Sequence, residues 1–103
     1  MNNSEFCMVL NYILGKDDYQ WLNDFAEKHR KKEIERAVNS FQTEKVNKIQ
    51  AMSTQGYLFY ALCDEDFEKR LAQSGISKRD SKRFTAIVAK LRCEKRWQDE
   101  TFV

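Results

Sequence analysis

The chain has 103 residues, of which 42% are hydrophobic and 33% charged, with a formal net charge of +2. This length supports one hydrophobic core, and the hydrophobic share is too high for a disordered chain. The lack of proline and the presence of only three glycines favour helices joined by short turns, while one histidine and three cysteines without Cys-x-x-Cys spacing argue against a zinc site.

The first two predicted helices lie in the N-terminal third of the chain. The segment SEFCMVLNYILG predicts a helix that begins with Ser4 as its N-cap and ends at Gly15. A second helix follows, for which we expect Asp17 or Asp18 as the N-cap. Its apolar residues recur at helical spacing on one face, namely Tyr19, Leu22, Phe25, Ala26 and His29.

A change of apolar phase after His29 predicts a bend or break at residues 30–32. Beyond it, a long third helix is expected to end at Gly56. The residues assigned to the apolar stripe of this helix are Ile34, Val38, Phe41, Ile49 and Met52.

The run from Tyr57 to Leu62 is the most apolar stretch of the chain, and we expect it to form a central core helix. A short helix over residues 65–74 is predicted next, with Asp64 as its cap and an end at Gly75. Ser77 and Asp80 then have the spacing of a capping-box variant. They predict a final helix from residue 78 to about residue 96.

The final helix is predicted to be strongly amphipathic. Phe84, Ile87, Val88 and Leu91 form a narrow apolar stripe. The opposite half of the helix carries the basic residues Lys78, Arg79, Lys82, Arg83, Lys90 and Arg96. Residues 68–96 contain ten Lys and Arg against three acids, so the rest of the chain has a net charge of about −5. Such a distribution attracts anionic partners to one end of the molecule.

The segment FEKRLAQSGISKRDSKRFTAIV resembles a helix-turn-helix motif, in which the second helix enters the major groove of DNA. Leu71, Ile76 and Phe84 fit the inward-facing positions of that motif, whereas Arg70 and Ser81 depart from it. The resemblance implies nucleic-acid contacts, with duplex DNA as the expected ligand. The implied contact residues are Arg70, Lys78, Arg79, Ser81, Lys82, Arg83 and Lys90. The alternative interpretation is an amphipathic helix whose cationic face is simply solvated.

A second functional hypothesis rests on the aromatic residues. Trp21 and Trp97 lie off the apolar stripes of their helices, and Trp97 follows Arg96, a combination that is typical of protein interfaces. Under this hypothesis the chain is an adaptor or inhibitor that binds a protein, including one that handles nucleic acid. Each tryptophan can equally pack against a neighbouring helix. A homodimer would bury the same surface and would suit a protein that reads paired DNA half-sites.

No catalytic motif is present, and His29 is expected to be a half-buried helix residue rather than an acid-base group. We therefore expect a non-enzymatic protein without cofactor, metal or small-molecule substrate. The apolar segment from Phe6 to Leu14 is too short to span a bilayer, so we expect a cytoplasmic protein. The predicted fold is an all-α, single-domain bundle of about five helices, the last two in a helix-turn-helix-like arrangement.

Overall fold

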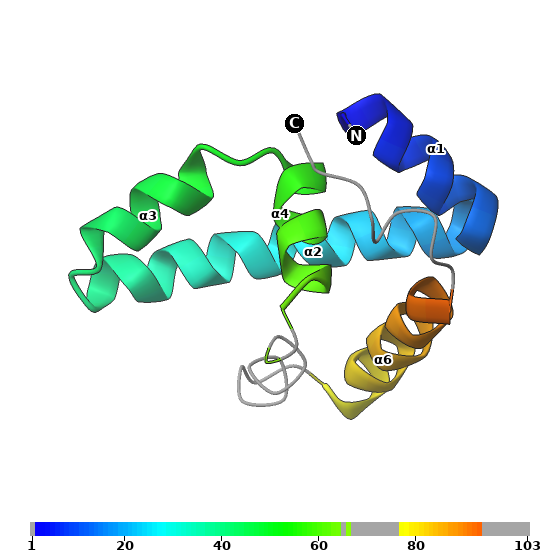
Figure 1. Ribbon diagram of the computed structural model, residues 1–103. Coiled ribbons are helices and arrows are strands. Elements are labelled where there is room, and N and C mark those ends of the chain that lie inside the picture. The colour runs from blue at the N-terminus through cyan, green and yellow to red at the C-terminus, as the bar shows by residue number, and fades with distance from the viewer. Residues whose placement is uncertain (1, 65, 67–76, 94–103) are drawn as a thin grey trace.

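The computed structural model describes residues 2–64, 66 and 77–93, and these residues form an all-α fold. Its helices are α1 (Asn3–Leu14), α2 (Lys16–Asn39), α3 (Thr43–Gln50), α4 (Thr54–Leu62) and α6 (Lys78–Cys93). The long helix α2 runs through the molecule, with α1, α4 and α6 around its N-terminal half and α3 alongside its C-terminal half (Figure 1). The predicted fold class is confirmed.

The first helix ends where expected but begins with a different cap. Asn2, rather than Ser4, is the N-cap of α1, and its Oδ1 accepts a hydrogen bond from the Glu5 N–H at 2.9 Å. Gly15 ends the helix with φ of 83°, a backbone conformation that glycine adopts without steric cost. The same glycine begins α2, which has no side-chain cap, so the expected caps Asp17 and Asp18 lie inside the first turn.

The predicted bend at residues 30–32 is wrong, because α2 is a single helix of 24 residues. The apolar phase changes there because the two halves of α2 pack against different neighbours. Leu22, Ala26 and His29 are buried in the N-terminal half, which contacts α1, α4 and α6. In the C-terminal half, Ala37 is buried, and the neighbours are α3 and, at Glu33, Tyr57 of α4.

The chain instead reverses direction at residues 40–42, inside the predicted third helix. The Gln42 N–H donates to the Ala37 carbonyl at 2.9 Å, and the Phe41 N–H donates to the Val38 carbonyl at 3.1 Å. Phe41 has φ of 57°. These bonds define a Schellman motif with phenylalanine at the position where glycine is usual. The resulting α2–α3 hairpin extends to the left in Figure 1.

Helix α4 begins earlier than the sequence predicts. Ser53 caps it by accepting a hydrogen bond from the Gly56 N–H at 3.0 Å, so Gly56 lies within α4 and does not end the preceding helix. Tyr57, Leu58, Ala61 and Leu62 are buried, which confirms the expected central helix. The predicted helix at residues 65–74 and its end at Gly75 lie outside the described residues, as does the helix-turn-helix turn.

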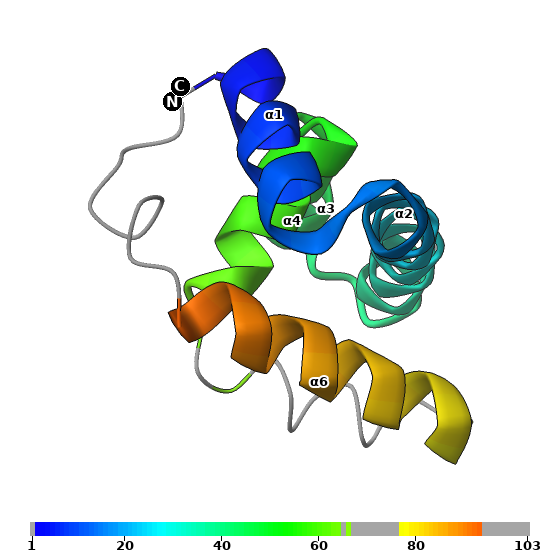
Figure 2. The same cartoon turned by 90° about the vertical axis from the view of Figure 1, so that its right-hand side faces the viewer.

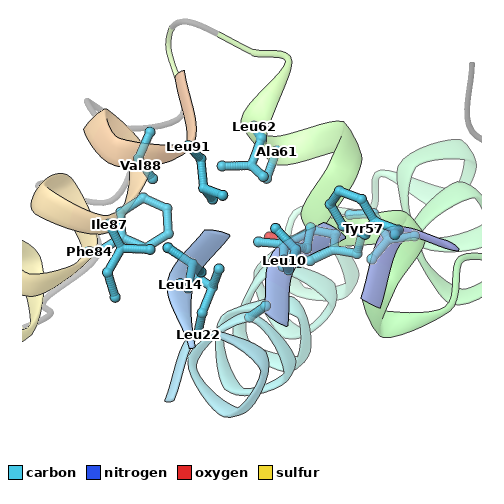
Figure 3. Close-up of a cluster of buried hydrophobic side chains, with 14 residues drawn as sticks. Leu10, Leu14, Leu22, Tyr57, Ala61, Leu62, Phe84, Ile87, Val88 and Leu91 are labelled. Carbon is cyan, nitrogen blue, oxygen red and sulfur yellow. The ribbon is translucent and has the colours of Figure 1, made fainter. Parts of the chain in front are cut away.

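The core forms where α1, α2, α4 and α6 meet. Figure 3 shows Leu91 of α6 beside Leu62 and Ala61 of α4, with Phe84 and Ile87 near Leu14 and Leu22. Phe25 of α2 stacks on Phe84 at 5.0 Å between ring centroids. The α6 stripe of Phe84, Ile87, Val88 and Leu91 is buried as predicted, so the opposite side of α6 faces solvent.

Candidate nucleic-acid interface

The start of α6 is determined by its cap. Ser77 Oγ accepts a hydrogen bond from the Asp80 N–H at 3.2 Å, and the Ser77 carbonyl accepts one from the Ser81 N–H at 3.0 Å. This arrangement confirms Ser77 as the expected cap. Because the buried stripe begins at Phe84, the first turn of α6 extends beyond the core with its side chains exposed or half-buried.

Three of the predicted contact residues lie together on this exposed end. Lys78, Arg79 and Lys82 are all exposed, and their positions on the helix are opposite the buried stripe. Helix geometry places them within two turns, about 6 Å along the axis. The structure thus brings together three of the seven residues that the helix-turn-helix resemblance implies as nucleic-acid contacts.

Ser81 and Lys90 differ in their relation to this group. Ser81 is half-buried beside the basic end. Lys90 is exposed on the outward side of α6, eight residues after Lys82 and so about 12 Å further along the axis. The outward positions between them are small, with Ala86 and Ala89 both exposed. The outward surface of α6 therefore has cations at both ends and little side-chain bulk between them.

Arg83 is directed toward α2 and makes two contacts there. Its Nη2 lies 3.3 Å from Asp18 Oδ1, and its guanidinium carbon lies 4.7 Å from the centre of the Trp21 ring. Arg83 thus fastens α6 to α2 while its side chain stays 46% exposed. The Asp18 carboxylate compensates part of the Arg83 charge. A residue that only contacts phosphate would have no such acidic partner.

Trp21 is half-buried and packs within the molecule. Its ring stacks on Phe25 with 5.0 Å between centroids and an interplanar angle of 18°. Arg83 covers part of its remaining surface. The other predicted contact residues, Arg70, Arg96 and Trp97, lie outside the described residues.

Exposed apolar residues occur where the sequence predicted a buried stripe. Phe41 is 92% exposed and Val38 52% exposed, because the reversal at residue 41 removes them from the interior. With Ala37, Gln42, Thr43 and Val46 they line a shallow pocket of about 240 Å³ at the end of the hairpin. Asn39 and Ser40, which favour helix ends, were the only local signal of this turn.

His29 is buried in α2, where the sequence predicts a half-buried residue. Its ring lies 6.3 Å from Phe25 and 6.4 Å from Tyr57, measured between centroids.

Two other groups have shifted pKa values. Burial and a hydrogen bond to the Cys7 sulfur raise the pKa of Tyr19 above its usual value, and burial raises the pKa of the Cys63 thiol. In the part of the chain that the structure describes, no group of three His, Cys, Asp or Glu side chains is placed to hold a metal ion.

Comparison with known proteins adds no functional assignment, because no protein-family model, curated protein or solved structure matches the chain. None of the described helices is both long and apolar enough to cross a bilayer.

Proposed function

We propose that the protein is a small, non-enzymatic regulator that binds nucleic acid through the N-terminal half of α6. The observation that supports this most directly is the exposure of Lys78, Arg79 and Lys82 together, opposite the buried stripe of the same helix. The helix Lys78–Cys93 contains six Lys and Arg and one acid. Such a surface attracts phosphates over a range of about 10 Å in 0.1 M salt.

The placement of these cations is not explained by the stability of α6 itself. The first turn of a helix carries a partial positive charge from its unpaired N–H groups, and each cation there costs a few tenths of a kcal/mol. Residues 78–83 nevertheless carry four Lys and Arg and one acid. A bound phosphate would relieve this repulsion, because it interacts favourably with both the side chains and the helix end.

The outward face of α6 also suits the approach of a helix to the DNA major groove. That groove is about 12 Å wide and admits one helix. Ala86 and Ala89 allow the helix backbone to come close, while Lys82 and Lys90 lie on either side of them along the axis. Lysine and arginine at such positions contact phosphates or guanine edges.

A duplex-binding measurement over a series of salt concentrations tests this proposal. We expect the logarithm of the affinity to fall steeply with the logarithm of salt, and a K78Q/R79Q/K82Q variant to reduce that slope by about two to three. The matched control is K16Q/K31Q/K48Q, which removes three exposed cations from other helices. Equal losses in both variants, or duplex binding that is absent at low salt, would contradict the proposal.

A second candidate function is that of a helical adaptor that binds a protein, and one observation favours it. Phe41 is 92% exposed at a strained φ of 57°, beside the pocket at the end of the hairpin. Exposed aromatic residues of this kind contribute strongly to protein interfaces. Under this function, Phe41→Ala abolishes capture of a protein partner and K78Q/R79Q/K82Q leaves it intact, whereas nucleic-acid binding requires the opposite result.

A further inference from the structure

One face of α2 changes from aromatic to cationic along its length. The residues that share this face, at spacings of three or four, are Asp18, Trp21, Phe25, Lys28, Lys32 and Arg36. The first three contact α6. Asp18 and Trp21 contact Arg83, and Phe25 contacts Phe84. The last three are all cations.

The change occurs just after Phe25, whose ring stacks on Phe84 of α6. Figure 1 shows α6 below the N-terminal half of α2, with its N-terminal end pointing down and away from α2, and Figure 2 shows it crossing beneath α2. Lys28 follows Phe25 by one turn, about 4.5 Å along the axis. Lys28 and Arg36 are exposed, and Lys32 is half-buried. The three cations thus lie on the same face of α2 whose N-terminal part contacts α6.

Glu33, which follows Lys32 in the sequence, contacts residues of α4 and α3. Glu33 accepts a hydrogen bond from the Tyr57 hydroxyl at 2.5 Å and lies 3.5 Å from Lys45 Nζ. Tyr57 belongs to α4 and Lys45 to α3. These two contacts direct the Glu33 carboxylate toward α3 and α4.

We propose that Lys28, Lys32 and Arg36 form the second half of a two-helix phosphate-binding surface, whose first half is Lys78, Arg79 and Lys82. This inference rests on the proposed function and extends it to a second helix. The expected ligand is a nucleic-acid duplex, with α6 in a groove and α2 along the adjacent backbone. Related geometry occurs in proteins whose recognition helix enters the groove while another helix crosses the backbone.

The composition of the surface favours a duplex over other anionic ligands. Proteins that bind single strands stack the bases on exposed aromatic rings. Among the described residues, the large exposed hydrophobic side chains are Met8, Tyr12, Val38, Phe41 and Tyr60. None of them belongs to the two cationic groups, and Trp21 is covered by Arg83. Cations without large exposed aromatic rings beside them suit the outward-facing phosphates of a duplex.

The experiment compares three triple variants with the wild-type chain. K28Q/K32Q/R36Q tests α2, K78Q/R79Q/K82Q tests α6, and K16Q/K31Q/K48Q is the control. Each is titrated with a fluorescent 24-base-pair duplex and with one of its single strands between 50 and 200 mM salt. We expect the α2 variant to bind the duplex about tenfold or more weakly at low salt, with a slope reduced by about two to three. The control should remain close to wild type.

The possible outcomes separate this inference from the proposed function. Wild-type duplex binding by the α2 variant, together with loss in the α6 variant, would overturn the two-helix surface and leave the proposed function standing. Absence of salt-dependent binding by the wild-type chain would overturn both. Equal affinity of the wild-type chain for the single strand would overturn the duplex assignment. Circular dichroism checks folding, and the single variants Lys28→Gln and Arg36→Gln replace the triple variant if it unfolds.

Discussion

The guanidinium of Arg83 lies over the ring of Trp21, 4.7 Å from its centre, and 3.3 Å from the carboxylate of Asp18. These contacts link α6 to the N-terminal end of α2, beside the stack of Trp21 on Phe25 and of Phe25 on Phe84. Trp21 therefore contributes to the position of α6, and its substitution has a structural effect as well as any effect on binding.

The coupling between Trp21 and Arg83 is measurable by a double-mutant cycle. We expect Trp21→Ala to lower the free energy of unfolding by about 1 to 3 kcal/mol, because it removes a half-buried ring and its stacking on Phe25. The coupling with Arg83→Gln should be about 0.5 to 1 kcal/mol. Urea unfolding of the four chains gives these values. If the two substitutions have additive effects, the contact between Trp21 and Arg83 contributes nothing to the free energy of unfolding.

Replacing Phe41 with asparagine is expected to leave stability unchanged or to raise it. A left-handed backbone costs most non-glycine residues about 1 to 2 kcal/mol, and asparagine tolerates it better than phenylalanine. Because Phe41 is 92% exposed, the substitution loses little packing. Thermal unfolding provides the measurement, with Val38→Asn as a comparison at normal helical φ. A clear loss of stability in Phe41→Asn would show that the ring packs in solution.

Gly15→Ala is expected to destabilise the fold although there is space for the new methyl group. No atom lies within 4 Å of the Cβ position, but φ is 83°. The cost is therefore one of backbone conformation, about 1 to 3 kcal/mol. Gly56→Ala is not a suitable control because Gly56 is buried, so an exposed helical site such as Gln20→Ala is used instead. A Gly15→Ala chain as stable as wild type would contradict this explanation.

Tyr57→Phe tests the contact between α4 and α2. The substitution removes the hydrogen bond from the Tyr57 hydroxyl to Glu33 and keeps the buried ring. Since a carboxylate loses a donor, we expect the free energy of unfolding to fall by about 1 to 3 kcal/mol. The double variant Tyr57→Phe, Glu33→Gln should recover part of this loss, because residue 33 then carries no charge that needs the hydroxyl donor. Denaturant midpoints of the three chains decide the matter.

Tyr19 makes part of the stability depend on alkaline pH. Burial, followed by the hydrogen bond that its hydroxyl donates to Cys7 Sγ at 2.9 Å, raises its pKa above 10. The neutral phenol is thus favoured in the folded state, and its contribution is complete below pH 10 and is lost as pH rises through the folded pKa. We expect Tyr19→Phe to lose less stability than wild type between pH 9 and 11. A Tyr19 titration at or below pH 10, followed by ultraviolet absorbance, would refute this.

The sequence predicted the parts of the fold that depend on helical periodicity. The buried stripe of α6, the central position of Tyr57 and Leu58, and the end of α1 at Gly15 all follow local rules of spacing and backbone freedom. The reversal at Phe41 could not be predicted in this way, because the motif there contains phenylalanine instead of glycine. The supposed bend at residues 30–32 came from a real change of phase, whose cause is the exchange of neighbouring helices along α2.

The candidate surface was only partly predictable for a related reason. The spacing of Lys78, Arg79 and Lys82 opposite Phe84 and Leu91 is sufficient to place them on the outward face of one helix. The contacts of Arg83 depend on where α2 crosses α6, which no local pattern specifies. The same holds for Lys28, whose relation to α6 depends on the crossing of two helices far apart in the sequence.

The position of α3 has a consequence for the cooperativity of unfolding. This helix packs chiefly against α2 and contributes one buried residue, Ile49, to the core cluster, whereas α1, α4 and α6 contribute three or four each. Separation of α3 from α2 would therefore expose little apolar surface, and its backbone amides should exchange with deuterium through a partial opening. The amides of α4 should exchange only when the whole domain unfolds.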